Sequence, residues 1–156
     1  MTGDLLEYHN HYGPQASDLY ERVWWRGVLA RLLASLLGQP YMLALLSDRY
    51  PDSVVLSKHA AVYRAIRLEH IIGTAGSLGF DANFRPLTRK DRERLISVAI
   101  GMLADPSSLP PIHVVEVAGD YYVVDGHHRV SVAKALKRLY LDAEVVSNGH
   151  TPSGTA

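Results

Sequence analysis

The sequence predicts a mixed α/β fold, in which a sheet and its helices are preceded by an N-terminal helical extension. Hydrophobic residues make up 47% of the 156 residues and charged residues 21%, values that are typical of a globular domain and too apolar for a disordered chain. Apolar residues recur at helical spacing early in the chain, and strand patterns alternate with helical patterns after that. We therefore expect an extension over residues 1–52, a domain over 53–146 and a disordered tail over 147–156.

The extension is predicted to be mostly helical. Asp18 and Glu21, three residues apart, have the form of a capping box, and leucines at roughly helical spacing continue as far as Leu37. A Gly-Gln-Pro segment then ends the pattern, and a shorter helix is expected over 41–48. Such an amphipathic helix is compatible with a membrane surface or a partner protein, although packing on its own domain is the commoner case. Because its apolar positions are numerous, we expect a homodimer through the N-terminal helices or a close contact between domains.

Composition also excludes several classes of protein. The most apolar window, 28–37, is interrupted by Arg31 and has about half of the ~20 residues that a spanning helix needs. The first residues include two acids and no basic region, so we expect no secretory signal. The chain has no cysteine, which excludes disulfides, thiolate metal ligands and cysteine nucleophiles. These features predict a cytoplasmic protein without a membrane span.

Strands and helices alternate through the predicted domain. Strands are indicated by short runs rich in β-branched and aromatic residues, and helices by apolar residues on one face. In order, we expect a strand at 62–68, a long loop at 73–87, a helix over 88–105, a hairpin of strands at 112–117 and 121–124, a helix over 126–138 and a strand at 141–146.

The most informative segment is the turn where the second hairpin strand passes directly into a helix through Asp125 and Gly126. Glycine allows a sharp turn and leaves room for a ligand against the backbone. We expect Asp125 to cap the amides of His127 and His128. The start of a helix offers unpaired N–H donors and the positive end of the helix dipole, so this turn is a candidate anion site.

Helical angles sort the side chains that follow the turn. Ser131, Lys134 and Arg138 share the stripe of His127, whereas Arg129 falls on the apolar side, where an unpaired cation is costly. Arg129 must therefore pair with a carboxylate, reach a ligand anion or extend into water, and we rank it first among the anion ligands. A purely structural helix start explains the same residues equally well. No metal site is predicted, because adjacent histidines on a helix point about 100° apart.

The Asp-Gly-His-His-Arg motif between a hairpin strand and a helix resembles the signature of the ParB/sulfiredoxin superfamily, in a variant similar to its ParB-like nuclease-type domains. The resemblance covers residues 63–146. The segment Ile66-x-Leu68-Glu69-x-Ile71 is similar to the family's opening motif, and Phe80-Asp81 is similar to the Phe-Asp pair before its first domain helix. The resemblance implies a ParB/sulfiredoxin-like mixed sheet with helices, and it leaves the N-terminal helices unexplained.

Members of the superfamily have several activities, and the residues of the motif distinguish between some of these activities. Sulfiredoxin has a nucleophilic cysteine where this chain has His127, so sulfinic-acid reduction is excluded. The ParB proteins that bind CTP carry Gly-Glu-Arg-Arg-x-Arg, of which only Gly126 and Arg129 match here. The superfamily's free-serine kinases hold nucleotide phosphates with a glycine–His–Arg turn, which resembles Gly126, His128 and Arg129. In those kinases an acid of the opening segment acts as the base.

The candidates for that acid are Glu69 and Asp81, and the second of these lies in the long loop at 73–87. Long loops are often functional. Asp81 is suited to take a proton or to hold Mg²⁺, and Arg85 is suited to meet a phosphate. A surface loop in which Asp81 simply pairs with Arg85 is an equal alternative.

We therefore expect binding of a nucleotide or another phosphorylated small molecule at the strand-to-helix turn, with ATP, ADP or CTP and a bridging Mg²⁺. If the protein is an enzyme, the expected reaction is phosphoryl transfer or nucleotide hydrolysis. The expected phosphate ligands are Asp125, Gly126, His127, His128, Arg129, Ser131 and Arg85, and the expected catalytic residues are Glu69 and Asp81.

The alternative function is a non-enzymatic regulatory module that binds DNA or a protein. A formal net charge of zero argues against strong DNA binding, so this alternative depends on a local basic surface. The residues that would form it are Lys134, Lys137 and Arg138 with Arg89, Arg92 and Arg94.

Overall fold

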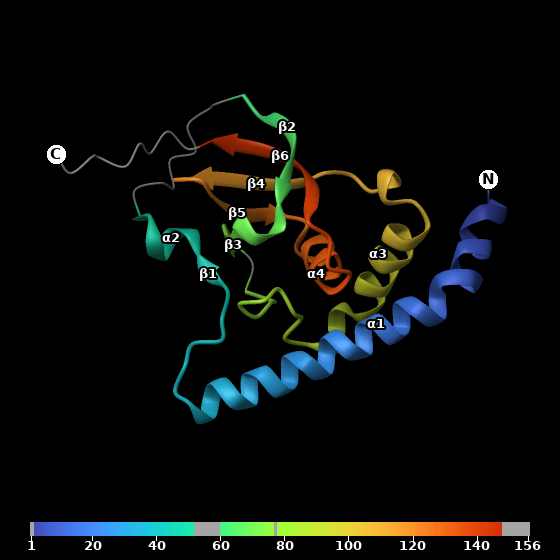
Figure 1. Cartoon of the computed structure of the whole chain (residues 1–156), viewed down its shortest axis with the longest axis horizontal. Helices are drawn as coiled ribbons and strands as arrows, with labels where there is room; N and C mark the ends of the chain where they lie inside the picture. The colour runs from blue at the N-terminus through green and yellow to red at the C-terminus, as the bar shows by residue number, and fades with distance from the viewer. Residues whose placement is uncertain (1, 52–59, 77, 148–156) are drawn as a thin grey trace.

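The computed structural model describes residues 2–51, 60–76 and 78–147. It confirms the mixed α/β prediction, because helices pack on a mixed sheet of six strands (Figure 1). Of the predicted tail, only Ser147 lies within the described residues. None of the helices in the described ranges combines the length and the apolar character that crossing a membrane requires.

The six strands are β1 (Ala44–Leu45), β2 (Val62–Arg67), β3 (Ile71–Thr74), β4 (Ile112–Val117), β5 (Asp120–Asp125) and β6 (Tyr140–Ser147). Their order across the sheet is β1-β3-β5-β4-β6-β2. β4 and β5 form the predicted antiparallel hairpin, and β6 pairs in parallel with β4 and antiparallel with β2. β3 joins β5 on one side and β1 on the other, in parallel with both.

The sequence prediction missed β3, part of which it assigned to a loop. Gly73 is the reason, because a glycine inside a short apolar run is typical of a loop or a break. In the structure, the sheet requires this glycine. A Cβ added at Gly73 would lie 2.5 Å from the carbonyl oxygen of Ala44 and 2.7 Å from Cδ1 of Tyr122. The glycine therefore lets β1 and the Tyr122 ring approach β3 closely.

Helix α1 begins much earlier than predicted. It spans Thr2–Leu36, so the predicted capping box at Asp18 and Glu21 is wrong: both residues lie inside the helix. Gly13 and Pro14 lie inside this helix and do not end it. The face that packs on the core consists of residues spaced by one helical turn, namely Ala16, Leu19, Tyr20 and Val23.

The remaining helices follow the predictions more closely. They are α2 (Leu46–Arg49), α3 (Arg92–Ala104) and α4 (His127–Ala135). α2 is only the last part of the helix predicted over 41–48, because β1 occupies the residues before it. α3 follows a short 3-10 turn, and α4 ends near Leu136, one residue before Lys137, which has a positive φ of 56°.

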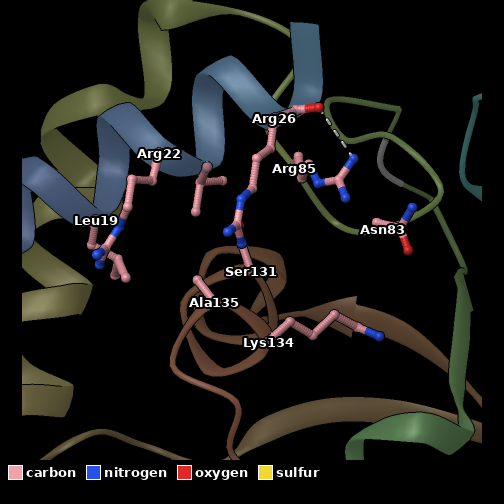
Figure 2. A pocket seen from close by; sticks show the side chains of 9 residues that line it. Leu19, Arg22, Arg26, Asn83, Arg85, Ser131, Lys134 and Ala135 are labelled. Atoms are coloured by element: carbon pink, nitrogen blue, oxygen red, sulfur yellow. Dashed lines mark hydrogen bonds between the residues drawn. The ribbon is translucent and has the colours of Figure 1, made fainter. Parts of the chain in front are cut away.

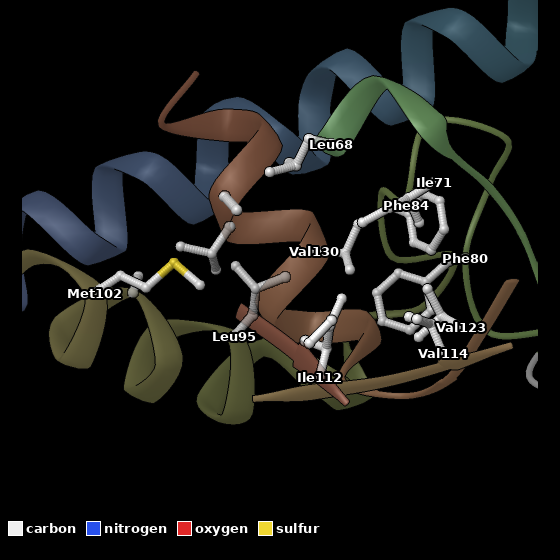
Figure 3. Close-up of a cluster of buried hydrophobic side chains, with 14 of the residues drawn as sticks. Leu68, Ile71, Phe80, Phe84, Leu95, Met102, Ile112, Val114, Val123 and Val130 are labelled. Carbon is white, nitrogen blue, oxygen red and sulfur yellow. The ribbon is translucent and has the colours of Figure 1, made fainter. Parts of the chain in front are cut away.

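The main core lies between one face of the sheet and the helices α1, α3 and α4 (Figures 1 and 3). Leu19 and Tyr20 of α1 belong to the same buried cluster as Val130 of α4, so the N-terminal extension contributes directly to this core. A smaller cluster on the opposite face combines Leu46 of α2 with residues of β4 and β5, namely Val115, Val117 and Tyr122. Because helices cover both faces, β5 is buried on both sides where it carries Tyr121-Tyr122-Val123.

The C-terminal half of α1 presents an exposed apolar stripe. Trp25, Leu29, Leu32, Leu33 and Leu36 are spaced so that they share one helix face, and their exposed fractions run from 56% to 83%. The homodimer through the N-terminal helices stays a prediction, and this stripe is the surface that would form it. A contiguous apolar patch of this kind marks an interaction site more often than a free surface.

We expect Leu33→Glu to convert a dimer into a monomer, because a carboxylate on this stripe would have to lose its water at the interface. Sedimentation equilibrium on both proteins measures the change. Leu139→Glu is the matched control, since Leu139 is 74% exposed and lies outside α1. A wild-type chain that is monomeric at high concentration contradicts the prediction.

Candidate functional site

A cavity of about 580 Å³ opens where β5 passes into α4, at the turn that the sequence predicted as the site. We call it the β5–α4 cavity. Its volume lies in the range of roughly 300–1,000 Å³ that is usual for small-molecule sites. The loop after β3, the helix α3 and the segment before β4 form its other walls. Its polar lining residues are Arg94, Asp125, His127, His128 and Arg129.

The backbone of the turn is shaped by Gly126, which is the N-cap residue of α4. Its φ of 105° lies in the left-handed region, and a Cβ at this position would lie 2.5 Å from Cγ2 of Ile112. The first turn of a helix has amide donors without intrahelical acceptors, and here no side chain caps them. The prediction that Asp125 caps these amides is therefore wrong. The amides belong to residues that line the cavity.

Arg129 is held in place by three acceptors. Its Nη1 donates to the carbonyl oxygens of Pro110 and Pro111, the latter at 2.7 Å. Its Nη2 donates to Oδ2 of Asp125 at 2.7 Å. Of the three outcomes that the sequence allowed for this buried cation, pairing with a carboxylate is the one observed. Arg129 thus ties the start of α4 to the segment before β4, and it neutralises Asp125.

His127 is a buried, neutral residue, and its contacts hold the turn in place. Its ring is 7% exposed, stacks on Phe80 with the ring centres 5.6 Å apart, and places Nε2 2.8 Å from Oγ1 of Thr74. Burial is the main cause that lowers the pKa of His127 to about 4, and the neighbouring His128 adds to this effect. The contact with Thr74 links α4 to β3.

His128 is more accessible and faces an acid. Its Nε2 lies 3.3 Å from Oδ1 of Asp91, without hydrogen-bond geometry, and this nitrogen has no hydrogen-bond partner within the described ranges. Burial lowers the pKa of His128, and the negative charge of Asp91 works against that shift. This nitrogen is buried against Asp91, so the atom itself is not exposed to the cavity.

The net charge of the β5–α4 cavity is positive. Asp125 is its one carboxylate among the lining residues that the structure describes, and Arg129 already pairs with it. Arg94, from the first turn of α3, is exposed and forms no ion pair with any residue in the described ranges. Arg94 is therefore the cation that is free to meet an anion. From the sequence, Arg94 was predicted only as part of a basic surface.

The two candidate bases lie away from this cavity. Asp81 is buried, and its Oδ1 accepts the backbone amides of Asn83 at 2.9 Å and Arg85 at 3.0 Å. It therefore shapes the loop, which favours the structural alternative for this residue. Glu69 is exposed, and its Oε1 accepts a hydrogen bond of 2.7 Å from Nη1 of Arg67 in an ion pair, on a separate surface depression. Neither carboxylate lines the β5–α4 cavity.

Two of the predicted phosphate ligands also lie elsewhere. Arg85 and Ser131 line a second cavity, between α1 and α4 (Figure 2), and not the β5–α4 cavity. The structure thus brings together Asp125, Gly126, His127, His128 and Arg129, and separates them from the other predicted residues.

The basic surface predicted for DNA binding is divided in the structure. Arg89 and Arg92 both lie within 4.0 Å of Glu21, and Arg138 donates to the carbonyl oxygen of Met102. Lys134 points toward the Phe84 ring and lines the second cavity. The six residues therefore do not present one uncompensated basic face.

No group of three or more metal-ligating side chains occurs among the described residues. No protein-family model matches this chain, and no curated protein matches it. The ParB/sulfiredoxin resemblance therefore stays a prediction that rests on the motifs quoted above.

Proposed function

We propose that this protein binds the phosphate group of a nucleotide, or of another phosphorylated small molecule, in the β5–α4 cavity. The observation that carries the proposal is the first turn of α4, whose amides no side chain caps, opening on a cavity where Arg94 is unpaired within the described ranges. Helix N-termini attract anions through their free N–H groups and the helix dipole.

The other residues of the turn support this assignment. Asp125 would repel a phosphate, but Arg129 neutralises it through a hydrogen bond of 2.7 Å. His128 lines the cavity beside the same helix start. The cavity volume of about 580 Å³ accommodates more than a phosphate group, so the remainder of a nucleotide would also fit.

The proposed activity is nucleotide binding. If the bound nucleotide is consumed, the reaction is phosphoryl transfer or nucleotide hydrolysis. Glu69 and Asp81 are not part of it, because one is exposed elsewhere and the other holds a loop. If Mg²⁺ accompanies the nucleotide, Asp125 is the lining carboxylate that would reach it, and phosphate and water oxygens would supply the other ligands. The ion would neutralise phosphate charge.

Titration calorimetry with ATP, ADP and CTP, each with and without Mg²⁺, tests the proposal. We expect Arg94→Ala to weaken binding by about 10- to 100-fold, the equivalent of the ~1.5–3 kcal/mol of a hydrogen bond to a charged group. Arg67→Ala is the control, because Arg67 is exposed and lies on β2, outside the cavity. A wild-type protein that binds none of these nucleotides contradicts the proposal, and so does equal binding by Arg94→Ala.

The DNA-binding alternative predicts a different result. It predicts duplex DNA binding that weakens steeply with salt, because each phosphate contact releases counterions. Gel shifts at several salt concentrations measure this slope. Steep salt dependence together with no nucleotide binding would replace our proposal by the alternative.

A further inference from the structure

A second cavity, of about 230 Å³, lies between α1 and α4. We call it the α1–α4 cavity. Figure 2 shows Arg22 and Arg26 reaching down from α1, with Ser131 and Lys134 of α4 below them and Arg85 at one side. It shares no lining residue with the β5–α4 cavity.

Among the described residues, the charged side chains that line this cavity are all positive. Its lining includes four cations and, among the residues that the structure describes, no carboxylate. Arg22 and Arg26 lie one helical turn apart, and neither forms an ion pair within the described residues. Like charges at this spacing repel each other. An anion between them would remove that repulsion.

Asp81 compensates these cations only in part. Oδ2 of Asp81 lies 3.8 Å from Nη1 of Arg85, but it is equally close to Arg31. Lys134 forms no ion pair within the described ranges: its Nζ lies 5.5 Å from the centre of the Phe84 ring, and burial lowers its pKa. The surplus of positive charge is therefore a property of the folded chain.

Ser131 provides an independent indication of a ligand. It is 3% exposed, it lines the cavity, and its Oγ has no hydrogen-bond partner in the described part of the chain. A buried hydroxyl without a partner destabilises a protein, so such groups are rare unless something else satisfies them. An oxoanion beneath Arg26 would accept this hydrogen bond.

We propose that the α1–α4 cavity binds a phosphate group, free as phosphate or pyrophosphate or as the end of a larger ester, between Arg22, Arg26 and Ser131. Guanidinium groups match the geometry of phosphate oxygens and bind them with paired hydrogen bonds. The volume of about 230 Å³ is below the usual range for whole small-molecule ligands, so the phosphate enters and the rest of an ester stays outside. This site is independent of the proposed nucleotide site.

Calorimetry of the full chain with inorganic pyrophosphate tests the proposal. We expect Arg26→Ala to weaken binding at this site at least tenfold, and Arg22→Ala to act in the same way. Both arginines are exposed on a helix, so alanine preserves the fold. Arg67→Ala, on β2, is again the control. Equal binding by the wild type and Arg26→Ala overturns the proposal, and so does a wild type that does not bind pyrophosphate.

The two proposed sites are distinguished by stoichiometry. If both exist, the wild type binds two equivalents of pyrophosphate, and Arg26→Ala and Arg94→Ala each lose one. If only the α1–α4 site exists, one equivalent binds and Arg26→Ala removes it. If Arg94→Ala alone removes it, pyrophosphate occupies the β5–α4 cavity and the present proposal fails. Repeating the titration with ATP separates a free phosphate from an ester.

Ser131→Ala gives a second measurement that a merely structural hydroxyl would not reproduce. Removing a buried group without a partner is expected to keep or raise the melting temperature of the unliganded protein. The rise in melting temperature that saturating pyrophosphate causes in the wild type should be smaller in Ser131→Ala. An unchanged rise shows that Ser131 does not contact the ligand, and overturns its place in the site.

Discussion

Gly126→Ala is expected to lower the free energy of unfolding by about 2–5 kcal/mol, the largest change that we predict for any single substitution. Two costs add. A residue with a Cβ loses about 1–2 kcal/mol in the left-handed region, where Gly126 has a φ of 105°. The new methyl group would also lie 2.5 Å from Cγ2 of Ile112, and crowding of this kind in a core costs about 1–3 kcal/mol. Urea denaturation measures the sum.

Two other glycines separate these costs. Gly119 has a φ of 87° but no atom within 4 Å of an added Cβ, so Gly119→Ala should show only the conformational cost. Gly13 lies within α1 and has no crowding beyond its chain neighbours, but the ring of Pro14 opposes a Cβ on the helical residue before it, so Gly13→Ala should show a local steric cost without a left-handed φ. If Gly126→Ala costs no more than Gly119→Ala, the contact between the turn and Ile112 is not as described.

The turn at Gly126 also shows which parts of the fold local sequence could predict. The hairpin of β4 and β5, the helix α3 and the passage into α4 each have a strong local signal, because apolar spacing and turn residues agree there. The first half of α1 has no such signal. Gly13 and Pro14 oppose a helix there locally, and within the described residues the buried side chains of α1 begin only at Ala16.

The sequence predicted the central residues of the candidate site, 125–129, but not the residues that surround them. Residues 125–129 are consecutive, so one motif placed them together. Ser131 shares the angular position of His127 around the helix, but it lies one turn, about 6 Å, further along the axis. That distance moves it from the β5–α4 cavity to a position under α1. A helical wheel gives the angle of a side chain and leaves out this axial separation.

Contacts between distant segments were the other missing information. Arg94 reaches the β5–α4 cavity only because α3 packs beside α4, and no spacing rule relates residue 94 to residue 126. Thr74 contacts His127 because β3 lies next to β5 in the sheet. Because Gly73 obscures the strand pattern of β3 in the sequence, local spacing does not place Thr74 beside His127.

The pH dependence of stability follows from the burial of His127. Its pKa is about 4 in the folded chain and about 6.5 in an unfolded one. Between these values the unfolded state binds more protons, so stability rises with pH across this interval. The contribution is complete above pH 6.5 and is lost as the pH falls toward 4. Because the ring is 7% exposed, we expect the loss to be about 2–3 kcal/mol. His128, whose pKa is also lowered, adds to it in the same direction.

His127→Gln isolates this contribution, because glutamine retains a polar group near Thr74 and does not titrate. Urea denaturation of both proteins at several pH values between 4 and 7 should show a shallower loss of stability in the variant. Carboxylates that titrate in the same pH interval change the stability of both proteins equally. Their contribution therefore cancels when the two free energies of unfolding are subtracted. His70→Gln is the matched control for the substitution itself, because it replaces an exposed histidine. Equal slopes for His127→Gln and the wild type would mean that His127 titrates in the folded chain as it does in the unfolded one, which contradicts its enclosure by Phe80 and Phe84.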